Sequence, residues 1–384
     1  MDVIINTSEN YRLDRVITCL EKIFDDMGGI KNIIKLGMRV AIKPNLLMAK
    51  KPEEAATTHP SVVHAVIKLV QQAGGIAVIV ESPGGPYNIP LLKMVYAKTG
   101  IEQIANETGA ELNFDLRVEK INNTDAEYLK SLKILKPLYD ADVIINLAKL
   151  KTHGFMVYTG AVKNMFGSIA GLEKSDYHLR MSNYELFANC LIDIFLATKP
   201  RINIIDGIIA MEGDGPSAGV PKYVGCLFAS TDAFACDYVA LKAIEVDYRK
   251  VPVMQIAEKR GMFDKNNVNI LGVDLDKIKP DSFDVPALSH QKTGSRFAIV
   301  RFIKNKFRPQ PEIVQDKCIR CGKCVEVCPP KAVTKNEDKL ISIDYKKCIS
   351  CFCCHEFCPE KAIRIRKNTL RKFLEYKRIN NNTP

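Results

Sequence analysis

A repeated cysteine pattern late in the chain is the feature that most limits how this sequence can fold. The pattern consists of Cys318, Cys321, Cys324, Cys328 and Pro329, and it recurs 30 residues later as Cys348, Cys351, Cys354, Cys358 and Pro359. Runs with this spacing hold cubane iron–sulfur clusters, and the fourth cysteine of each run ligates the cluster of the other run. The spacing therefore predicts two 4Fe-4S clusters in one interlocked module.

Residues 312–366 resemble bacterial ferredoxins with two 4Fe-4S clusters. The resemblance extends beyond the cysteines, because residues 329–333 are echoed by residues 359–363. It implies that one cluster is held by Cys318, Cys321, Cys324 and Cys358, and the other by Cys348, Cys351, Cys354 and Cys328. A pair of zinc sites is the alternative, but zinc modules usually supply two separated pairs of ligands. Cys353 is left over, and we expect a packed thiol there rather than an alternate ligand.

The length and composition are those of a globular protein with more than one domain. The chain has 384 residues, of which 47% are hydrophobic and 26% are charged. It has no run of 18 apolar residues, so we expect no membrane span. The first residues lack the order of a signal peptide, which predicts a cytoplasmic protein. In a reducing compartment we expect the four upstream cysteines, Cys19, Cys190, Cys226 and Cys236, to be small buried hydrophobes.

The net charge of +11 favours anionic partners. Basic residues are concentrated on both sides of the cysteine segment, including a basic tail over residues 367–384. A solvated linker and tail would account for these charges without any partner. No recognised nucleic-acid motif accompanies them, so we expect a redox partner protein or an anionic small molecule rather than a specific nucleic acid.

Residues 1–300 alternate between apolar strands and amphipathic helices. The expected strands are residues 38–42, 76–80, 143–147, 202–205 and 224–229, and polar loops follow most of them. This alternation predicts an α/β domain with a mostly parallel sheet. Residues 301–311 are expected to link it to an α+β two-cluster 4Fe-4S ferredoxin-like domain at 312–366. Ligands of such sheets bind at the carboxyl ends of the strands.

Several of these loops resemble the family described as domain of unknown function 362. The motifs are Lys43-Pro44-Asn45, Thr58-His59-Pro60, residues 149–154, residues 160–164, Asp206-Gly207 and residues 212–216. The resemblance spans residues 35–245, and it implies a C-terminal ferredoxin module, which members often carry. It implies no particular reaction, so the candidate site must be argued from the residues.

Lysines near the predicted strand ends are the first candidates for that site. They are Lys43, Lys149, Lys151 and Lys163, and ammonium groups gathered there would bind a carboxylate or a phosphate. A lysine beside other cations or partly buried can also act as a base or nucleophile, because its pKa falls. The alternative is that each is an ordinary surface lysine.

Four further residues complete the set of candidates. His153 could transfer a proton or stabilise its loop, and Glu212 could work as an acid or base or be a solvated acid in a Gly-rich turn. Asn45 and Asn164 could donate amide hydrogen bonds to a substrate or cofactor, or shape turns. His59 is expected to cap the helix that begins at Pro60.

The fusion of a ferredoxin module to an α/β domain predicts an iron–sulfur electron-transfer protein. The first hypothesis is an oxidoreductase in which two 4Fe-4S clusters feed electrons to an anionic substrate or cofactor bound near Lys43, Lys149, His153 and Lys163. The alternatives are a non-catalytic electron carrier or adaptor that docks a partner enzyme, and an assembly factor for iron–sulfur clusters or metals.

Overall fold

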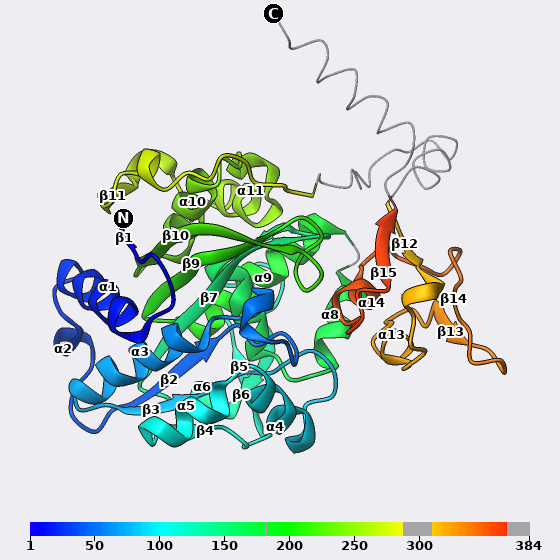
Figure 1. The fold of residues 1–384 in the computed structure, drawn as a ribbon, viewed down its shortest axis with the longest axis horizontal. Helices are drawn as coiled ribbons and strands as arrows, with labels where there is room; N and C mark the ends of the chain where they lie inside the picture. Colours follow the sequence, from blue (N-terminus) through cyan, green and yellow to red (C-terminus); the bar gives the residue numbers. More distant parts are fainter. Residues whose placement is uncertain (182, 287–308, 367–384) are drawn as a thin grey trace, which may run out of the picture.

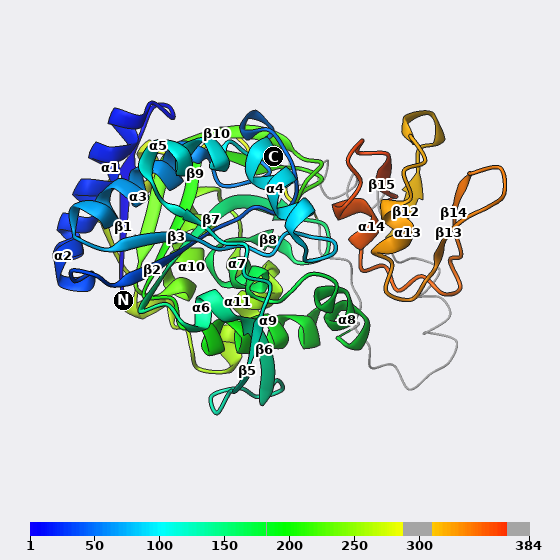
Figure 2. The ribbon, with the colours of Figure 1, turned by 90° about the horizontal axis from the view of Figure 1, so that it is seen from below.

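The computed structural model describes residues 1–181, 183–286 and 309–366. A large α/β domain occupies residues 1–286, and a small module over residues 309–366 lies beside it (Figures 1 and 2). The predicted basic tail and residues 301–308 of the predicted linker lie outside the described residues. Residues 310 and 311, also assigned to the linker, begin the first strand of the module.

A nine-stranded sheet forms the centre of the α/β domain. Its order is β11 (Asn269–Gly272), β1 (Asp2–Thr7), β10 (Val220–Ser230), β9 (Ile202–Glu212), β7 (Val143–His153), β2 (Arg39–Pro44), β3 (Ile76–Ile79) and β4 (Glu111–Leu112), with β8 (Val157–Thr159) paired to β7. All pairs from β9 to β4 are parallel, whereas β10 is antiparallel to both of its neighbours. The predicted mostly parallel α/β fold is confirmed.

Helices cover both faces of the sheet, which is why its strands are apolar on both sides. One face packs against α1 (Leu13–Asp26), α3 (Pro60–Gln72), α4 (Ile89–Lys98) and α5 (Ile101–Thr108). The other face packs against α7 (Ala161–Asn164), α9 (Tyr184–Thr198), α10 (Ala233–Ala243) and α11 (Pro252–Lys259). The short helices α2 (Ile30–Ile33) and α6 (Lys136–Tyr139), the helix α8 (Glu173–Arg180) and the hairpin of β5 (Val118–Asn122) and β6 (Ser131–Leu135) lie around this core.

The predicted helix starts and buried cysteines agree with the structure. His59 caps α3, since its Nδ1 accepts a hydrogen bond from the Ser61 backbone N–H, and Pro60 occupies the first helical position. Cys19, Cys190, Cys226 and Cys236 are all buried, and burial raises the pKa of each thiol. Among the described residues, no helix is long and apolar enough to span a membrane.

Two strands are much longer than their apolar runs predicted. We expected residues 149–154 to lie in a loop, but β7 continues through His153 and every residue of this strand is buried. Similarly, β9 continues past Asp206 to Glu212. The polar side chains in these extensions have internal hydrogen-bond partners, so they can lie inside the protein although their hydropathy marks them as exposed.

The small module is an α+β unit with two similar halves. Its strands are β12 (Gln310–Ile313), β13 (Val333–Lys335), β14 (Ile341–Ile343) and β15 (Ile363–Arg366), and its helices are α13 (Lys323–Glu326) and α14 (Cys353–Glu356). β12 pairs with β15 and β13 pairs with β14, both antiparallel. Each helix begins two residues after the second cysteine of a run. The residue between them is Gly322 before α13 and Phe352 before α14.

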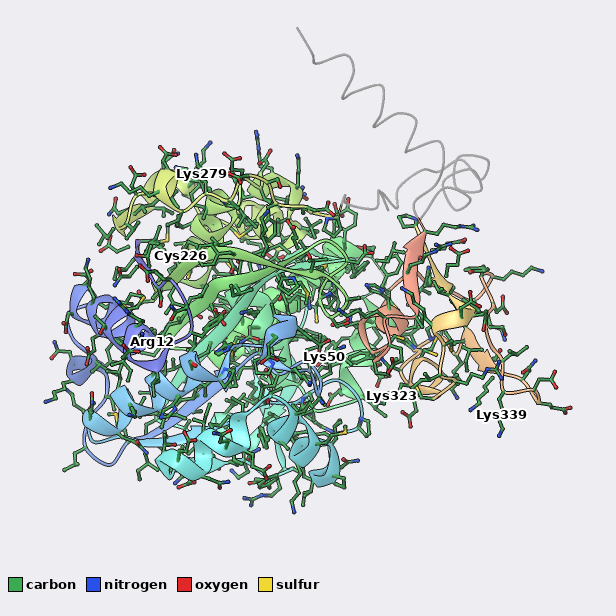
Figure 3. All side chains as sticks on the ribbon, in the orientation of Figure 1. Arg12, Lys50, Cys226, Lys279, Lys323 and Lys339 are labelled. Carbon is green, nitrogen blue, oxygen red and sulfur yellow. The ribbon has the colours of Figure 1, made fainter. Side chains whose placement is uncertain are left out.

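The module contacts the α/β domain through α14 and the residues after it (Figures 1 and 2). The Ser217 hydroxyl donates a hydrogen bond to the Glu356 carbonyl oxygen at 2.6 Å. Lys50, labelled in Figure 3, donates from Nζ to the Pro359 carbonyl oxygen at 3.2 Å. These contacts hold the second cysteine run against the edge of the sheet where β2, β3 and β7 end.

Candidate functional site

The eight cysteines of the repeat converge into two groups of four. A cavity of about 370 Å³ is lined by Cys318, Cys321, Cys324 and Cys358, together with apolar side chains. The Cys324 thiol, whose pKa is raised by burial to about 11, is close enough to Cys321, Cys358 and Cys318 to interact electrostatically with them. The Cys354 thiol interacts in the same way with Cys351, Cys348 and Cys328, and also with Cys324 of the first group.

Backbone N–H groups donate hydrogen bonds to the sulfur atom of the fourth cysteine in each run, which is expected to bind the cluster of the other run. The Ala332 N–H donates to Cys328 Sγ, and the Ala362 N–H donates to Cys358 Sγ, both at 3.2 Å. Such bonds stabilise negative charge on thiolates and are one means of setting a cluster potential. The thiols and the cavity of the first group therefore suit a cubane cluster, and the assignment of all eight cysteines as cluster ligands stays a prediction.

A second cavity lies between the module and the α/β domain. It encloses about 660 Å³, part of it open to solvent. Its polar lining residues are Asn45, Glu81, Ser82, Lys151, Thr159, Lys163, Asn164, Lys174, Ser175, His178 and Glu356, and Cys353, Phe166 and Phe357 line it as well. The α/β side is built at the carboxyl ends of β2, β3 and β7, where ligands of open α/β sheets bind. This space is called the interface pocket below.

Three amino groups reach the interface pocket without a carboxylate in hydrogen-bond contact. Lys151 Nζ donates to Asn45 Oδ1 at 2.8 Å and to the Ala56 carbonyl oxygen at 2.6 Å. Lys174 Nζ donates to the Ser82 hydroxyl at 3.1 Å and to the Pro83 carbonyl oxygen at 2.9 Å. Lys163 Nζ lies 6.0 Å from the centre of the Phe166 ring, and it has no hydrogen-bond partner within the described residues.

The buried environment of these three lysines lowers the pKa of each amino group. Burial, aided by the nearby Lys163 charge, lowers the pKa of Lys151 to about 7. Burial also lowers the pKa of Lys174 to about 7. Burial lowers the pKa of Lys163 as well, and the nearby Glu356 carboxylate opposes this shift without cancelling it. An anion placed among the three would favour the charged forms. The interface pocket therefore suits a ligand that brings negative charge.

Lys43 supports the floor of this pocket through Glu81. Both side chains are buried, and Lys43 Nζ donates to Glu81 Oε2 at 2.9 Å. The same oxygen accepts from the Leu46 N–H, and the other accepts from the Ser82 N–H. The backbone of Gly167 passes so close that an added Cβ would lie 2.7 Å from Lys43 Nζ. The pair thus fixes three neighbouring loops, and its charge is already neutralised.

A row of amide side chains connects the pocket with the interior of the sheet. Asn45 Nδ2 donates to Asn164 Oδ1 at 2.9 Å, and Asn164 Nδ2 donates to Asn146 Oδ1 at 2.7 Å. Asn146 Nδ2 then donates to Asn203 Oδ1 at 2.9 Å. Because each amide has a fixed partner, the row sets the position of the Asn45 oxygen that receives Lys151.

Lys149 belongs to a separate buried network on the same strand. Its Nζ donates to Asp206 Oδ2 at 2.8 Å and to the Tyr11 hydroxyl at 2.9 Å. Asp206 also accepts from the Tyr11 hydroxyl at 2.7 Å and from the His59 N–H at 2.9 Å. Lys149 and Asp206 are not among the residues that line the interface pocket. The network ties β7 and β9 to the loops before α1 and α3.

Two neutral histidines lie at or behind the pocket. His153 Nδ1 accepts from the backbone N–H groups of Phe155 and Met156, which leaves its proton on Nε2. That buried atom lies 3.8 Å from Glu356 Oε1 and has no hydrogen-bond partner among the described residues. His178 stacks on Phe187, and burial lowers the pKa of its ring to about 3.

The module contributes the remaining wall of the interface pocket. Cys353 is 1% exposed and lines the pocket, although its neighbours Cys351 and Cys354 belong to the second group of cysteines. The Phe357 ring lies against Gly84, and a Cβ at Gly84 would overlap the ring. The module therefore presents a thiol, a carboxylate and an aromatic ring to the three lysines.

Comparisons with known proteins agree with both parts of this architecture. Residues 40–242 match the family model described as domain of unknown function (DUF362). The chain belongs to the DUF362 family. Residues 310–359 match the model of a 4Fe-4S dicluster domain, which supports iron–sulfur binding over zinc. Both resemblances drawn from the sequence are confirmed.

One relative of this DUF362 protein is the Thylakoid-associated protein sll1697 from Synechocystis sp. It is 33% identical over 260 residues, which are 66% of this chain and 78% of the relative. A solved structure, the lactate racemase apoprotein from Thermoanaerobacterium thermosaccharolyticum, is similar with a TM-score of 0.41 and 16% identity. That similarity covers 64% of this chain and 57% of the racemase chain.

The DUF362 domain brings only some of the predicted residues to one place. Asn45, Lys163 and Asn164 line the interface pocket, whereas Lys43 and Lys149 each bind a buried carboxylate. We predicted Lys149 and His153 in a loop, but both lie on β7. Glu212 ends β9 and accepts a hydrogen bond from the Asp284 N–H at 2.8 Å, and it does not line the pocket.

Sequence reasoning missed Glu81, Lys174, His178 and the role of Cys353. Lys174 and His178 lie on α8, whose sequence gives no sign that it covers a pocket. Cys353 carried a usable signal. It occupies the position of Lys323 in the first cysteine run, and a buried thiol in place of an exposed lysine marks a surface that is covered.

Proposed function

We propose that this protein is an iron–sulfur oxidoreductase that reduces an anionic small molecule in the interface pocket. The observation that carries the proposal is the composition of that pocket. Lysines of the DUF362 domain form one wall, and residues beside the second group of cysteines form the other. A ligand held there would touch the side of the module from which electrons can leave.

The module would hold two clusters with the ligand sets given above. When bound, 4Fe-4S clusters supply single electrons, and a pair of them matches a two-electron reduction. Lys151, Lys163 and Lys174 would bind the negative charge of the substrate. A lysine whose pKa is near 7 can also release a proton to the reduced product at neutral pH. The overall reaction would add two electrons and two protons to one substrate bond.

The other predicted residues would act as positioning residues. Lys43 holds Glu81, Asn45 accepts a hydrogen bond from Lys151, and Asn164 holds Asn45, so these three would set the shape of the anion site. Lys149 fixes β7 to β9 through Asp206, and Glu212 fixes the segment around Asp284. His153 Nε2 lies 3.8 Å from the Glu356 carboxylate, so His153 would help to position it.

The test uses the full chain with its clusters reconstituted under anaerobic conditions. Clusters reduced with dithionite and freed of excess reductant are mixed with a panel of carboxylates and phosphate esters. Reoxidation is followed by electron paramagnetic resonance, and the product by mass spectrometry. We expect one class of anion to reoxidise the clusters and Lys163→Met to abolish this, whereas Lys68→Met, at an exposed position of α3, does not.

Two results would count against an oxidoreductase. Equal reoxidation in the Lys163 variant and in the unaltered protein would place the reaction outside the interface pocket. Failure of every anion, with clusters that remain fully reducible, would favour the electron carrier or adaptor predicted as the alternative. Transfer of iron to an apoprotein would instead favour an assembly factor.

A further inference from the structure

The two halves of the module are equivalent in sequence but differ in what covers them. The shared spacing aligns Arg320 with Ser350, Gly322 with Phe352, Lys323 with Cys353, Val325 with His355, Glu326 with Glu356 and Val327 with Phe357. Because both halves have the same backbone plan, equivalent positions lie on equivalent surfaces around the two groups of cysteines. A difference in residue type at such a pair reports a difference in surroundings.

The second half is buried by the α/β domain. Phe352, Cys353, His355 and Glu356 are all buried, and His355 Nε2 lies 3.2 Å from the Asp214 carbonyl oxygen. Phe352 even adopts a left-handed conformation, with φ of 63°, where the first half has Gly322. This conformation is unfavourable for a residue with a side chain, and burial of the ring offsets that cost.

The corresponding surface of the first half is open. Ile319 is 62% exposed, Cys321 is exposed although it is one of the predicted ligands, and Lys323 is exposed where the second half has buried Cys353. An apolar side chain beside an exposed cysteine sulfur is a suitable centre for a small protein contact. Electron-transfer contacts bury little surface, often less than about 1,200 Å² in total.

The charges around Ile319 are mainly positive. Lys317, Arg320, Lys323 and Lys335 are exposed, and Lys335 Nζ donates to the Arg320 carbonyl oxygen at 2.9 Å. Within the described residues none of these four cations forms an ion pair, while exposed Asp316, Glu326 and Glu360 carry the opposite charge nearby. The chain as a whole has a net charge of +11, which adds a long-range attraction for acidic proteins.

We propose that the surface formed by Lys317, Ile319, Arg320, Cys321 and Lys323 is the docking site for a small acidic protein that delivers single electrons. The donor surface is defined by these five residues. The second half faces the interface pocket and is covered, so the first half is the side of the module left for an external partner. In each step one electron would leave a reduced centre of the partner and enter the module. The proposal extends the proposed function by naming the chemistry of its electron donor.

The experiment uses the anaerobically reconstituted full chain and an acidic bacterial two-cluster ferredoxin as the probe. Affinity is measured by isothermal titration calorimetry at low and high salt, and electron transfer by stopped-flow absorbance. The double variant Arg320→Glu/Lys323→Glu is compared with Lys339→Glu, which changes an exposed lysine at the outer end of the module (Figure 3). Iron content and the resonance spectrum of each variant verify that the clusters are intact.

We expect the double variant to bind about tenfold more weakly and to accept electrons correspondingly more slowly, because like charges would meet at the contact. Lys339→Glu should stay within about twofold of the unaltered chain, and added salt should weaken binding of the unaltered chain. An equal loss in Lys339→Glu, or affinity that does not depend on salt, would overturn the donor surface.

The donor surface and the interface pocket can fail separately. Dithionite reduces the clusters without a protein partner, so the double variant reduced in this way should still be reoxidised by a substrate of the interface pocket. If the pocket has no substrate, the salt dependence and the charge-reversal result remain a complete test of the donor surface.

Discussion

Lys151 Nζ donates a 2.8 Å hydrogen bond to Asn45 Oδ1, and this bond joins the interface pocket to a row of amides that runs through Asn164 on α7 to β7 and β9. The row ends far from solvent at Asn203, which is fully buried. A long flexible side chain is thereby held in one position at the pocket. Lys151 is consequently the cation whose removal should affect anion binding most directly.

Replacing Lys151 by methionine should weaken anion binding about 10- to 100-fold, since a hydrogen bond to a charged group contributes about 1.5–3 kcal/mol. Sulfate is a suitable probe, because it stays ionised between pH 6 and 9. Its affinity is measured by isothermal titration calorimetry with Lys68→Met as the matched control. Similar affinity in the Lys151 and Lys68 variants would show that the pocket does not use this cation.

Sulfate affinity should decrease as the pH rises through about 7. Burial gives Lys151 and Lys174 a pKa of about 7 in the free protein, and a bound anion raises both because it favours the ammonium forms. Binding therefore takes up protons above pH 7, and the affinity is fully developed below that pH. The proton uptake is measured by calorimetry in buffers of different ionisation enthalpy. The double variant Lys151→Met/Lys174→Met should bind more weakly at every pH and with a smaller slope, because Lys163 remains in the pocket.

Asp206→Asn should destabilise the α/β domain by about 3–5 kcal/mol, because it leaves the Lys149 ammonium buried without its counter-charge. Asp140→Asn breaks an exposed pair with Lys136 and should cost less than about 1 kcal/mol. Urea unfolding followed by circular dichroism compares the two variants. Comparable urea midpoints would contradict a structural role for the Lys149–Asp206 pair.

Gly84→Ala should loosen the contact between the module and the α/β domain, because the new Cβ overlaps the Phe357 ring. Limited proteolysis between the two parts should become faster, while the cluster spectrum stays unchanged. The double variant Gly84→Ala/Phe357→Ala removes the overlap and should restore much of the resistance. Faster cleavage in the double variant than in Gly84→Ala would show that the overlap is not the cause.

Cys353→Ser should leave the iron content at about eight atoms per chain, the value for two cubane clusters. Cys351→Ser should lower it, since Cys351 is a predicted ligand and Cys353 is not. Iron and sulfide analysis of the anaerobically reconstituted chain, together with resonance spectra, distinguishes the two. Loss of iron in the Cys353 variant would make this thiol a ligand.

The sequence predicted those features that depend on local spacing. The cysteine run fixes the module because ligand geometry leaves little freedom, and the cap and proline at His59 and Pro60 fix the start of α3. The length of β7 could not be predicted, because Lys149 and Lys151 can be buried only where distant segments of the chain accept their hydrogen bonds. Lys174 joins the pocket for the same reason: its neighbours Ser82 and Pro83 are about 90 residues away.

Because Cys353, Glu356 and Phe357 form one wall of the interface pocket, a ligand can occupy the complete pocket only while the module is docked. Binding and docking are then thermodynamically linked, and each must strengthen the other by the same factor. A ligand present at 100 times its dissociation constant would stabilise the docked arrangement by about 2.7 kcal/mol. A bound substrate would in this way hold the two domains together, and they would separate most easily after the substrate has been released.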